Sequence, residues 1–249
     1  MISIKSTSEI VKMRAAGKVV YGTFRELEKY IAPGITTKEL NRIAEDYIRS
    51  KNAIPSFLNY YGYPKSICTS INDTIVHGIP DETVLKEGDI ISVDIGAVLD
   101  GYNGDAARTY PVGKISDEAK RLIDVTKESF FRGIEYARHG ERLHSIGATI
   151  QNYVESMGYS IVRNYTGHGI GKKMHEAPDV PNYGTFGKGI KVVRGMTIAV
   201  EPMVCAGGYQ TKQMADGWTV KTKDGSLAAH YENSLLITDG EPELLTLYD

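Results

Sequence analysis

The stretch IISVDIGAVLDGYNGDAARTYPV, residues 90–112, contains the most informative pattern in the chain. Its two arms are rich in apolar and β-branched residues, which favour extended strands. Asp100-Gly101 lies between the arms, and this dipeptide is a strong signal for a two-residue hairpin turn. The stretch therefore predicts two antiparallel strands, at 90–98 and 102–112.

A two-residue turn also determines which residues face each other, and it sets Gly96 opposite Asp105. Because side chains alternate between the faces of a strand, Asp94 shares a face with Gly96 and becomes a diagonal neighbour of Asp105. Apolar residues on both sides of Asp94 indicate a strand that is buried on its two faces. Buried carboxylates repel each other unless they share a proton or bind a cation. The pair predicts a metal site or, if the hairpin lies at the surface, two ordinary acids.

Helical patterns precede and follow this hairpin. Ser6 and Glu9 match a capping box, and apolar residues then recur at helical spacing until Pro33-Gly34. Thr36 caps a second helix that ends near residue 52, and a strand at 67–71 follows. After residue 116 the order restarts, with helices at 122–137 and 146–157 and strands near 160–162, 197–204 and 218–237.

The repeated order of two helices followed by strands predicts an α+β fold of two similar halves, 1–115 and 116–249. A cleft between their sheets could take ligands from both halves. No low-complexity linker separates them, so we expect one catalytic domain over 1–249. The alternative is a single mixed domain in which the repeated order is a coincidence.

Composition narrows the class of protein. The chain has 249 residues, 41% hydrophobic and 24% charged, which is typical of a soluble globular enzyme and unlike disordered or membrane proteins. Cys68 and Cys205 are too few for a disulfide framework, so both are expected to be reduced. The first residues lack the apolar stretch of a signal peptide, and no segment is long and apolar enough to cross a membrane. We expect a cytoplasmic protein with no membrane partner.

The chain is nearly neutral overall, but one segment is locally basic. The net charge is −2, so no general positive field favours nucleic acid. Between residues 163 and 194, however, Lys and Arg outnumber Asp and Glu. The ordinary interpretation is a solvated rim, and a contact with the ribosome is the alternative.

A glycine-rich stretch, GHGIG at 167–171, contains the first of two notable histidines, His168 and His175. Its spacing matches neither a P-loop nor a dinucleotide fingerprint, so a phosphate site is disfavoured. Both histidines are expected in a loop. The isolated histidines His139, His144 and His230 are each expected to be a surface group or a core group with satisfied hydrogen bonds rather than a ligand.

Two further acids lie at unusual positions. Glu201 closes the apolar run 197–200 and precedes Pro202, and Glu232 lies between Tyr231 and Asn233. An acid at the end of a buried strand is costly without a partner. Together with the earlier candidates these acids give four carboxylates and one imidazole, a donor set that favours two divalent cations: manganese, iron or cobalt, with zinc possible. The predicted ligands are Asp94, Asp105, His168, Glu201 and Glu232.

In this order, these residues and their surroundings resemble the type I methionine aminopeptidases over nearly the whole chain. The matching segments are YYGYP (60–64), CTSIN (68–72), VHGIP (76–80), VDIG (93–96), GD (104–105), GHGIG (167–171), HE (175–176), GMTIAVEPM (195–203), DGWT (216–219) and YE (231–232). The resemblance implies the pita-bread fold of two pseudo-symmetric halves, in its short bacterial form. It also implies metal-dependent removal of the initiator methionine from nascent proteins and peptides when the second residue is small.

The resemblance assigns roles to individual residues. One metal would be held by Asp94, Asp105 and Glu232, and the other by Asp105, His168, Glu201 and Glu232, with a bridging hydroxide that attacks the first peptide bond. Glu201 would shuttle the proton, His175 would stabilise the carbonyl oxygen and His77 would contact the scissile amide. The methionine side chain would be surrounded by Tyr60, Tyr63, Cys68, His77, His175 and Trp218, with Met174 close by. The enzyme is expected to be a monomer.

Two departures from the family pattern affect the surroundings of the metals. Gly96 stands where many members carry a hydroxyl residue, and Ala106-Ala107 replaces a polar pair. Hydrogen bonds to the carboxylates are therefore expected to differ, which bears on metal preference. Two alternatives remain: a proline-directed peptidase of the same fold, and a catalytically silent binding protein on the same scaffold.

Overall fold

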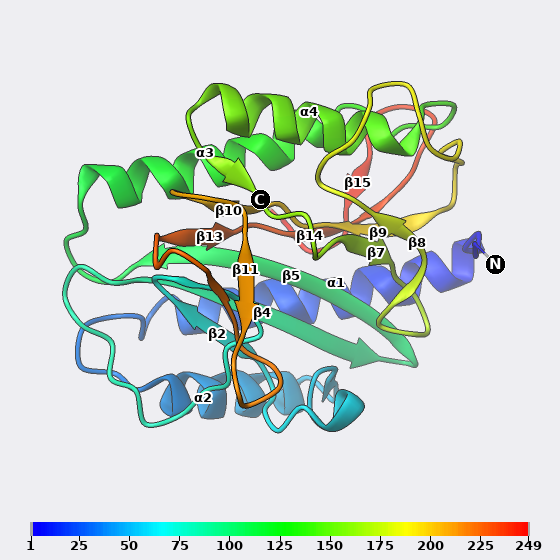
Figure 1. Cartoon of the computed structure of the whole chain (residues 1–249). Coiled ribbons are helices and arrows are strands. Elements are labelled where there is room, and N and C mark those ends of the chain that lie inside the picture. The colour runs from blue at the N-terminus through cyan, green and yellow to red at the C-terminus, as the bar shows by residue number, and fades with distance from the viewer. Residues whose placement is uncertain (1, 249) are drawn as a thin grey trace.

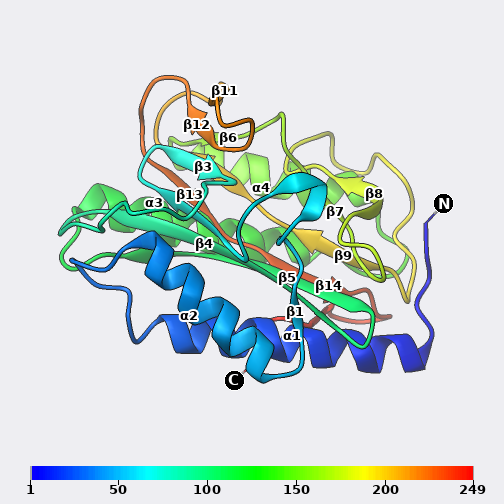
Figure 2. The ribbon, with the colours of Figure 1, turned by 90° about the horizontal axis from the view of Figure 1, so that it is seen from below.

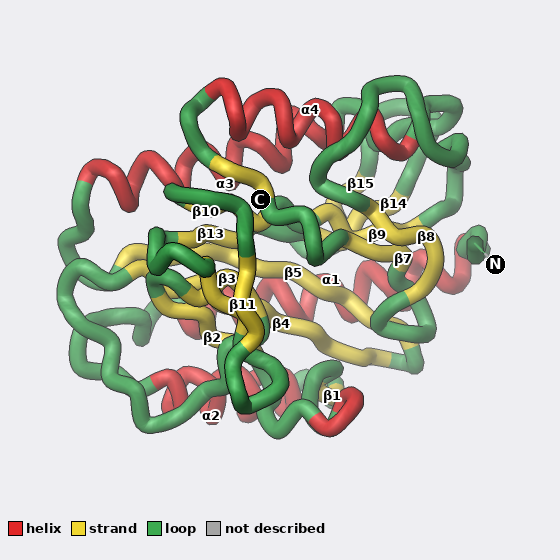
Figure 3. Tube along the Cα trace, in the orientation of Figure 1, coloured by secondary structure: helices red, strands yellow, loops and turns green. Residues whose placement is uncertain are grey.

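The computed structural model describes residues 2–248. Strands form the middle of the molecule, and two pairs of helices cover its outer sides (Figures 1, 2 and 3). The first pair is α1 (Thr7–Leu27) with α2 (Thr37–Ser50), and the second is α3 (Asp117–Ile134) with α4 (Leu143–Ser156). Within residues 2–248, no helix has the length and apolar character needed to span a membrane.

The hairpin is formed by β4 (Ile90–Leu99) and β5 (Tyr102–Pro111), as predicted. Its register is also confirmed, because Leu99 pairs with Tyr102 and Gly96 with Asp105. Asp100 and Gly101 both have positive φ, as a hairpin turn of this length requires. Both arms are largely buried, so the hairpin is an interior element rather than a surface loop.

The other strands are short, and together with β4 and β5 they form four sheets within residues 2–248. Their pairing orders are β1-β4-β2 with β5 also on β4, β13-β10-β6, β11-β12-β3, and β15-β14-β9-β7-β8. A 3-10 turn, η1 (Tyr60–Gly62), precedes β2. The bounds are β1 (Ile54–Pro55), β2 (Cys68–Ile71), β3 (Thr74–Val76), β6 (Ser160–Ile161), β7 (Gly167–Gly169), β8 (Glu176–Val180), β9 (Thr197–Val200), β10 (Met203–Cys205), β11 (Thr211–Gln213), β12 (Val220–Thr222), β13 (Ala228–His230), β14 (Asn233–Leu236) and β15 (Glu243–Leu244).

Capping side chains mark the starts of α1 and α3 more accurately than apolar periodicity does. Ser6 and Glu9 form the predicted capping box of α1. The expected start of α3 at residue 122 was late, because Ser116 caps the helix and its first turn is polar. The helix α4 begins at Leu143 rather than near 146, although Arg142 before it makes no capping bond, and α1 ends at Leu27, before the proline.

Two predicted strands are interrupted. The segment 197–204 divides at Glu201-Pro202 into β9 and β10, which belong to different sheets. Proline has no N–H to donate to a ladder, so the strand stops there and leaves Glu201 at its end. The segment 218–237 likewise divides into β12, β13 and β14.

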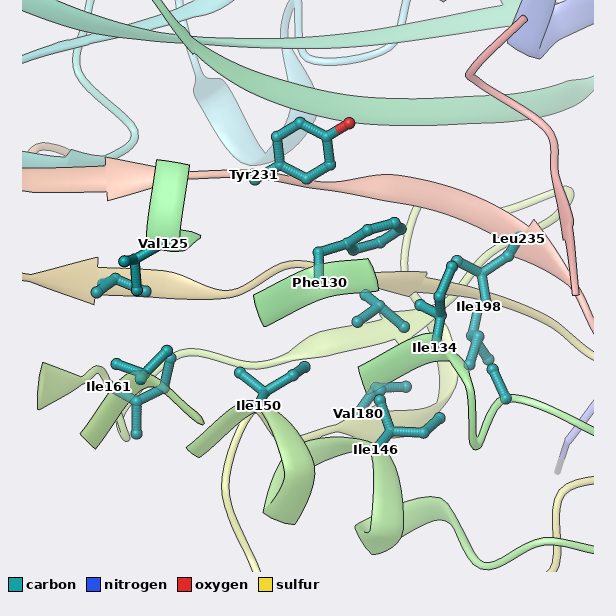
Figure 4. Close-up of a cluster of buried hydrophobic side chains, with 14 of the residues drawn as sticks. Val125, Phe130, Ile134, Ile146, Ile150, Ile161, Val180, Ile198, Tyr231 and Leu235 are labelled. Carbon is teal, nitrogen blue, oxygen red and sulfur yellow. The ribbon is translucent and has the colours of Figure 1, made fainter. Parts of the chain in front are cut away.

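Each helix pair covers its own cluster of buried apolar residues. The N-terminal cluster joins α1 and α2 to β4 and β5. In the C-terminal cluster, Phe130 of α3 lies between the strands and α4, and its ring contacts Tyr231 edge-on at 5.2 Å between centroids (Figure 4). A third, smaller cluster includes aromatic and sulfur-containing side chains, among them Phe57, Tyr63, Cys68 and Met174. The two large clusters hold the strands that carry the acids in place.

Candidate metal centre

The hairpin supplies the first two carboxylates. Asp94 on β4 and Asp105 on β5 are diagonal neighbours on one face, and their side chains contact each other. Asp105 is buried, and Asp94 is partly buried. The geometry predicted from the turn therefore holds.

The C-terminal half supplies the other three predicted ligands from adjacent strands. His168 lies in β7, Glu201 directly follows β9, and Glu232 lies between β13 and β14. Because β9 pairs with both β7 and β14, these side chains gather at one place. The expectation that His168 lies in a loop was wrong. A Cβ on Gly167 would come within 2.3 Å of the main-chain oxygen of Ala199, so glycine is what lets β7 approach β9.

Hydrogen bonds join the two halves at the acids themselves. The Glu232 amide donates to the carbonyl of Ala107 at 2.9 Å, and the Asp105 amide donates to Ser234 Oγ at 3.0 Å. The Arg108 guanidinium also donates to the carbonyl of Glu232. Asp105 and Glu232, which are far apart in sequence, are thereby held side by side.

The side chains meet at distances suited to shared cations. His168 Nε2 lies 3.7 Å from Asp105 Oδ2 and 3.7 Å from Glu201 Oε1. Ligand atoms of Asp105, His168 and Glu232 all lie within 4.8 Å of one another. His168 Nδ1 donates to the carbonyl of Gly169 at 2.9 Å, which turns the Nε2 lone pair toward the acids.

The electrostatics of the acids favour a bound cation. Burial raises the pKa of Asp94 to about 7, and burial together with neighbouring carboxylates raises the pKa of Asp105, Glu201 and Glu232 well above the ordinary range. Asp94 Oδ1, Asp105 Oδ1 and Glu232 Oε1 are buried without a hydrogen-bond partner among the described residues. Divalent cations would satisfy these oxygens and remove the repulsion, so the donor set fits them.

The imidazoles around the centre are neutral. Burial lowers the pKa of His77 to about 4 and that of His168 to about 3, and it also lowers the pKa of His175. A neutral ring can coordinate a metal or donate a hydrogen bond without adding charge.

A cavity of about 140 Å³ opens onto the carboxylates. A larger and more open hollow of about 610 Å³ beside β2 and β3 contains none of the predicted ligands. Every predicted site residue except Met174 lines the smaller cavity. Phe57, which the sequence did not single out, lines it as well. Its lining is Phe57, Tyr60, Tyr63, Cys68, His77, Asp94, Asp105, His168, His175, Glu201, Trp218 and Glu232.

The departure at Gly96 has a steric explanation. A Cβ at this position would lie 2.5 Å from Met174 Cε and 2.8 Å from Phe57 Cε1. Glycine therefore leaves room for two side chains of the cluster beside the cavity. Ala106 and Ala107 are fully buried, and the contact to Glu232 at this point comes from the main chain of Ala107.

The structure corrects one expectation about an isolated histidine. His230 is buried at the end of β13, but its Nε2 has no hydrogen-bond partner among the described residues and lies 3.7 Å from Glu232 Oε2, so it is not the satisfied core group that was expected. Its position two residues before Glu232 was the available signal, because alternation along an extended chain directs both side chains to one side.

The raised pKa values give a prediction for the metal-free protein. Between an ordinary carboxyl pKa near 4 and the folded value of about 7, the folded chain holds more protons than the unfolded chain. Its free energy of unfolding should therefore fall as the pH rises from about 5 to about 8. Urea unfolding with a chelator measures this, and Asp94→Asn, which removes one of the acids, should show a shallower decline. A stability that rises over this interval in the wild-type protein would contradict the prediction.

Fold and site together define a metallohydrolase with a carboxylate-rich centre for divalent cations. The chain belongs to metallopeptidase family M24, whose sequence profile matches residues 11–239. It is 60% identical to a methionine aminopeptidase of Clostridium acetobutylicum, over 99% of each chain, and 52% identical to methionine aminopeptidase 1 of Bacillus subtilis, again over 99% of each. The crystal structure of methionine aminopeptidase from Rickettsia prowazekii superposes with a TM-score of 0.98 at 46% identity, covering 99% of this chain and 100% of that one.

These comparisons confirm the resemblance and the pita-bread fold. The Xaa-Pro dipeptidase of Bacillus anthracis shares the fold at a TM-score of 0.78, but it is only 25% identical, and this chain covers 62% of its length. The similarity to the proline-directed branch is thus weaker and partial.

Proposed function

We propose that the chain removes the N-terminal methionine from peptides and nascent proteins whose second residue is small. The observation that carries this proposal is one cavity that combines the buried acids with an apolar wall of Tyr63, Cys68 and Trp218. The identity of 60% to a relative named methionine aminopeptidase supports the same activity.

Two divalent cations would be held by this donor set. We infer that Asp94, Asp105 and Glu232 hold one ion and that Asp105, His168, Glu201 and Glu232 hold the other. Carboxylate-rich ligation with an imidazole suits manganese, iron or cobalt, and zinc is compatible. When bound, two such cations lower the pKa of water and polarise the scissile carbonyl.

Glu201 carries the proton in this proposal. Its carboxylate takes a proton from the attacking water and passes it to the leaving nitrogen. Asn182 Nδ2 donates to the main-chain oxygen of Glu201 at 2.9 Å, which fixes the turn that follows β9.

His175 and His77 act on the substrate's peptide group. The His175 ring lies 4.1 Å from that of His168 between centroids, and its Nδ1 is 2.7 Å from the Tyr60 hydroxyl. Both contacts support a fixed orientation toward the carbonyl oxygen, where a donor stabilises developing charge. His77 is half-buried, meets Tyr165 edge-on and would contact the scissile amide.

An aromatic and sulfur-lined pocket would bind the methionine side chain. Tyr63 and Trp218 meet edge-on at 5.2 Å between centroids, and the Tyr63 hydroxyl donates to the carbonyl of Gly78 at 2.9 Å. Burial raises the pKa of the Cys68 thiol, which keeps it uncharged. Ring edges and thiols contact a thioether favourably, and Met174 packs behind them.

Selectivity at both positions tests the function. On Met-Ala-Ser, Leu-Ala-Ser and Met-Ile-Ser peptides, kcat/KM should be highest for the first. A pocket shaped for a thioether separates apolar side chains by about 1–3 kcal/mol, so the leucine peptide should be cleaved about 10-fold to 200-fold more slowly. The isoleucine peptide should be poor because His77 and the cavity wall crowd the second residue. Comparable cleavage of the leucine peptide, or rapid cleavage before isoleucine, would refute the pocket assignment.

We propose that the catalytic unit is a single domain over 1–249, built from the halves 1–115 and 116–249, and that it acts as a monomer in the cytoplasm.

A contact with the ribosome through the segment 163–194 would depend on the excess positive charge of this segment. Ion pairs with acids elsewhere in the chain neutralise part of that charge. Co-sedimentation with ribosomes at low but not at physiological ionic strength is the expected result, and its absence at both would contradict the contact. Three of the basic residues pair with acids outside the segment: Arg163 with Glu155, Lys172 with Glu9, and Arg194 with Asp239.

A further inference from the structure

His230 is a buried side chain that none of the roles above uses. Its backbone is fixed, since its amide donates to Thr109 Oγ1 at 2.9 Å and its carbonyl accepts from the same hydroxyl at 2.9 Å. Its ring is 2% exposed, and Nε2 has no hydrogen-bond partner among the described residues. A buried polar atom without a partner is costly, so its retention needs a reason.

The surroundings of His230 repeat those of His168. His230 Nε2 lies 3.7 Å from Glu232 Oε2 and 3.8 Å from Glu201 Oε2. His168 Nε2 likewise lies 3.7 Å from each of two carboxylate oxygens. These separations are too long for hydrogen bonds. The separation between His230 and Glu232 suits two ligands of one ion, because metal–ligand bonds of about 2.1 Å set neighbouring donors roughly 3–4 Å apart.

We propose that His230 is a further metal ligand, which binds through Nε2 to the ion held by Asp94 and Glu232. Ligand atoms of these three residues lie within 4.8 Å of one another. The proposal rests on the metal centre inferred above and adds a sixth protein ligand to it. Each of the two ions then has one imidazole, His168 for one and His230 for the other.

This assignment changes the chemistry of the second ion. With acids alone, the Asp94 position would suit hard cations such as magnesium or manganese. An added imidazole favours iron, cobalt or zinc and strengthens binding at this position. With one imidazole on each ion, the two ions should bind with more similar affinities. If only one ion had an imidazole, their affinities should differ more.

The test counts imidazoles and measures affinities, without using activity. Cobalt X-ray absorption on the wild-type protein with two equivalents of Co²⁺ should give about one imidazole per ion, and about half that number in His230→Gln. Calorimetric titration of His230→Gln should show that the affinity for one of the two ions falls by at least about 10-fold to 100-fold. Loss of a residue that only hydrogen-bonds to a metal ligand already lowers affinity by this much. His139→Gln, at an exposed histidine, is the matched control and should leave both quantities unchanged.

Each contrary outcome has a distinct meaning. About half an imidazole per ion in the wild-type protein would overturn the assignment without any variant, so a folding defect in His230→Gln cannot leave it undecided. The assignment would also be overturned if His230→Gln lowered the affinities for both ions equally while the metal-free variant unfolded like the metal-free wild-type protein. His230 would then support the whole centre and not bind one ion. Failure of the wild-type protein to bind two ions would instead refute the dinuclear centre on which the proposal rests.

Discussion

Replacing Glu201 by Gln is expected to lower kcat by about 10³-fold or more, while the fold stays intact. The amide has the size of the carboxyl group but cannot take a proton from water, and general acid–base catalysis alone contributes about 10²-fold to 10⁴-fold. The substitution also removes one negative charge from a cluster that binds cations. The measurement is kcat on Met-Ala-Ser at saturating Mn²⁺.

Metal content separates the two effects of this substitution. If calorimetry shows two bound ions and kcat is still reduced about 10³-fold, the loss belongs to proton transfer. Glu82→Gln serves as the matched control, since Glu82 pairs with Lys38 on the surface, and it should leave kcat unchanged. A Glu201→Gln enzyme that keeps more than about a tenth of the wild-type kcat would exclude Glu201 as the proton carrier.

The hairpin and its paired acids could be predicted because their causes are local. The Asp100-Gly101 turn sets the register, and the alternation of side chains then decides that Asp94 and Asp105 are neighbours. Nothing else in the chain has to be known. The break at Pro202 is also a local effect, yet the unbroken run of apolar residues masked it.

The placement of His168 could not be predicted in the same way. Glycines disfavour a strand when considered alone, and β7 is only three residues long. The strand exists because Gly167 and Gly169 let neighbouring backbones approach more closely than any side chain would allow. That requirement arises only in the assembled sheet, so local propensity gave the wrong answer.

The contacts between the two halves could not be predicted from the sequence patterns either. The main-chain bond from Glu232 to Ala107 and the pair of bonds between Asp105 and Ser234 join segments more than 100 residues apart. Periodicity identifies strands but does not say which distant strands meet. The identity of the acids was therefore predictable, whereas their mutual orientation and the presence of His230 beside them were not.

Asp105→Ala is expected to abolish activity and to weaken both metal ions, because Asp105 lies between the two groups of ligands. It contacts Asp94 on one side and lies 3.7 Å from His168 on the other. Asp94→Ala should instead spare the ion bound by His168 and Glu201. Calorimetric titration of both variants with Mn²⁺ distinguishes a bridging ligand from a ligand of one ion.

The melting temperature gives an independent test of Asp105→Ala, because the substitution should stabilise the metal-free protein although it abolishes activity. In the metal-free protein Asp105 is buried against other carboxylates, which raises its pKa, so its removal should relieve repulsion and raise the melting temperature at pH 8. Added metal should then reverse the order. A ligand at 100 times its dissociation constant stabilises the wild-type protein by about 2.7 kcal/mol, whereas a variant with weakened sites gains little. If Asp105→Ala binds two ions with unchanged affinity, or gains as much stability from Mn²⁺ as the wild-type protein, then Asp105 does not bridge the ions.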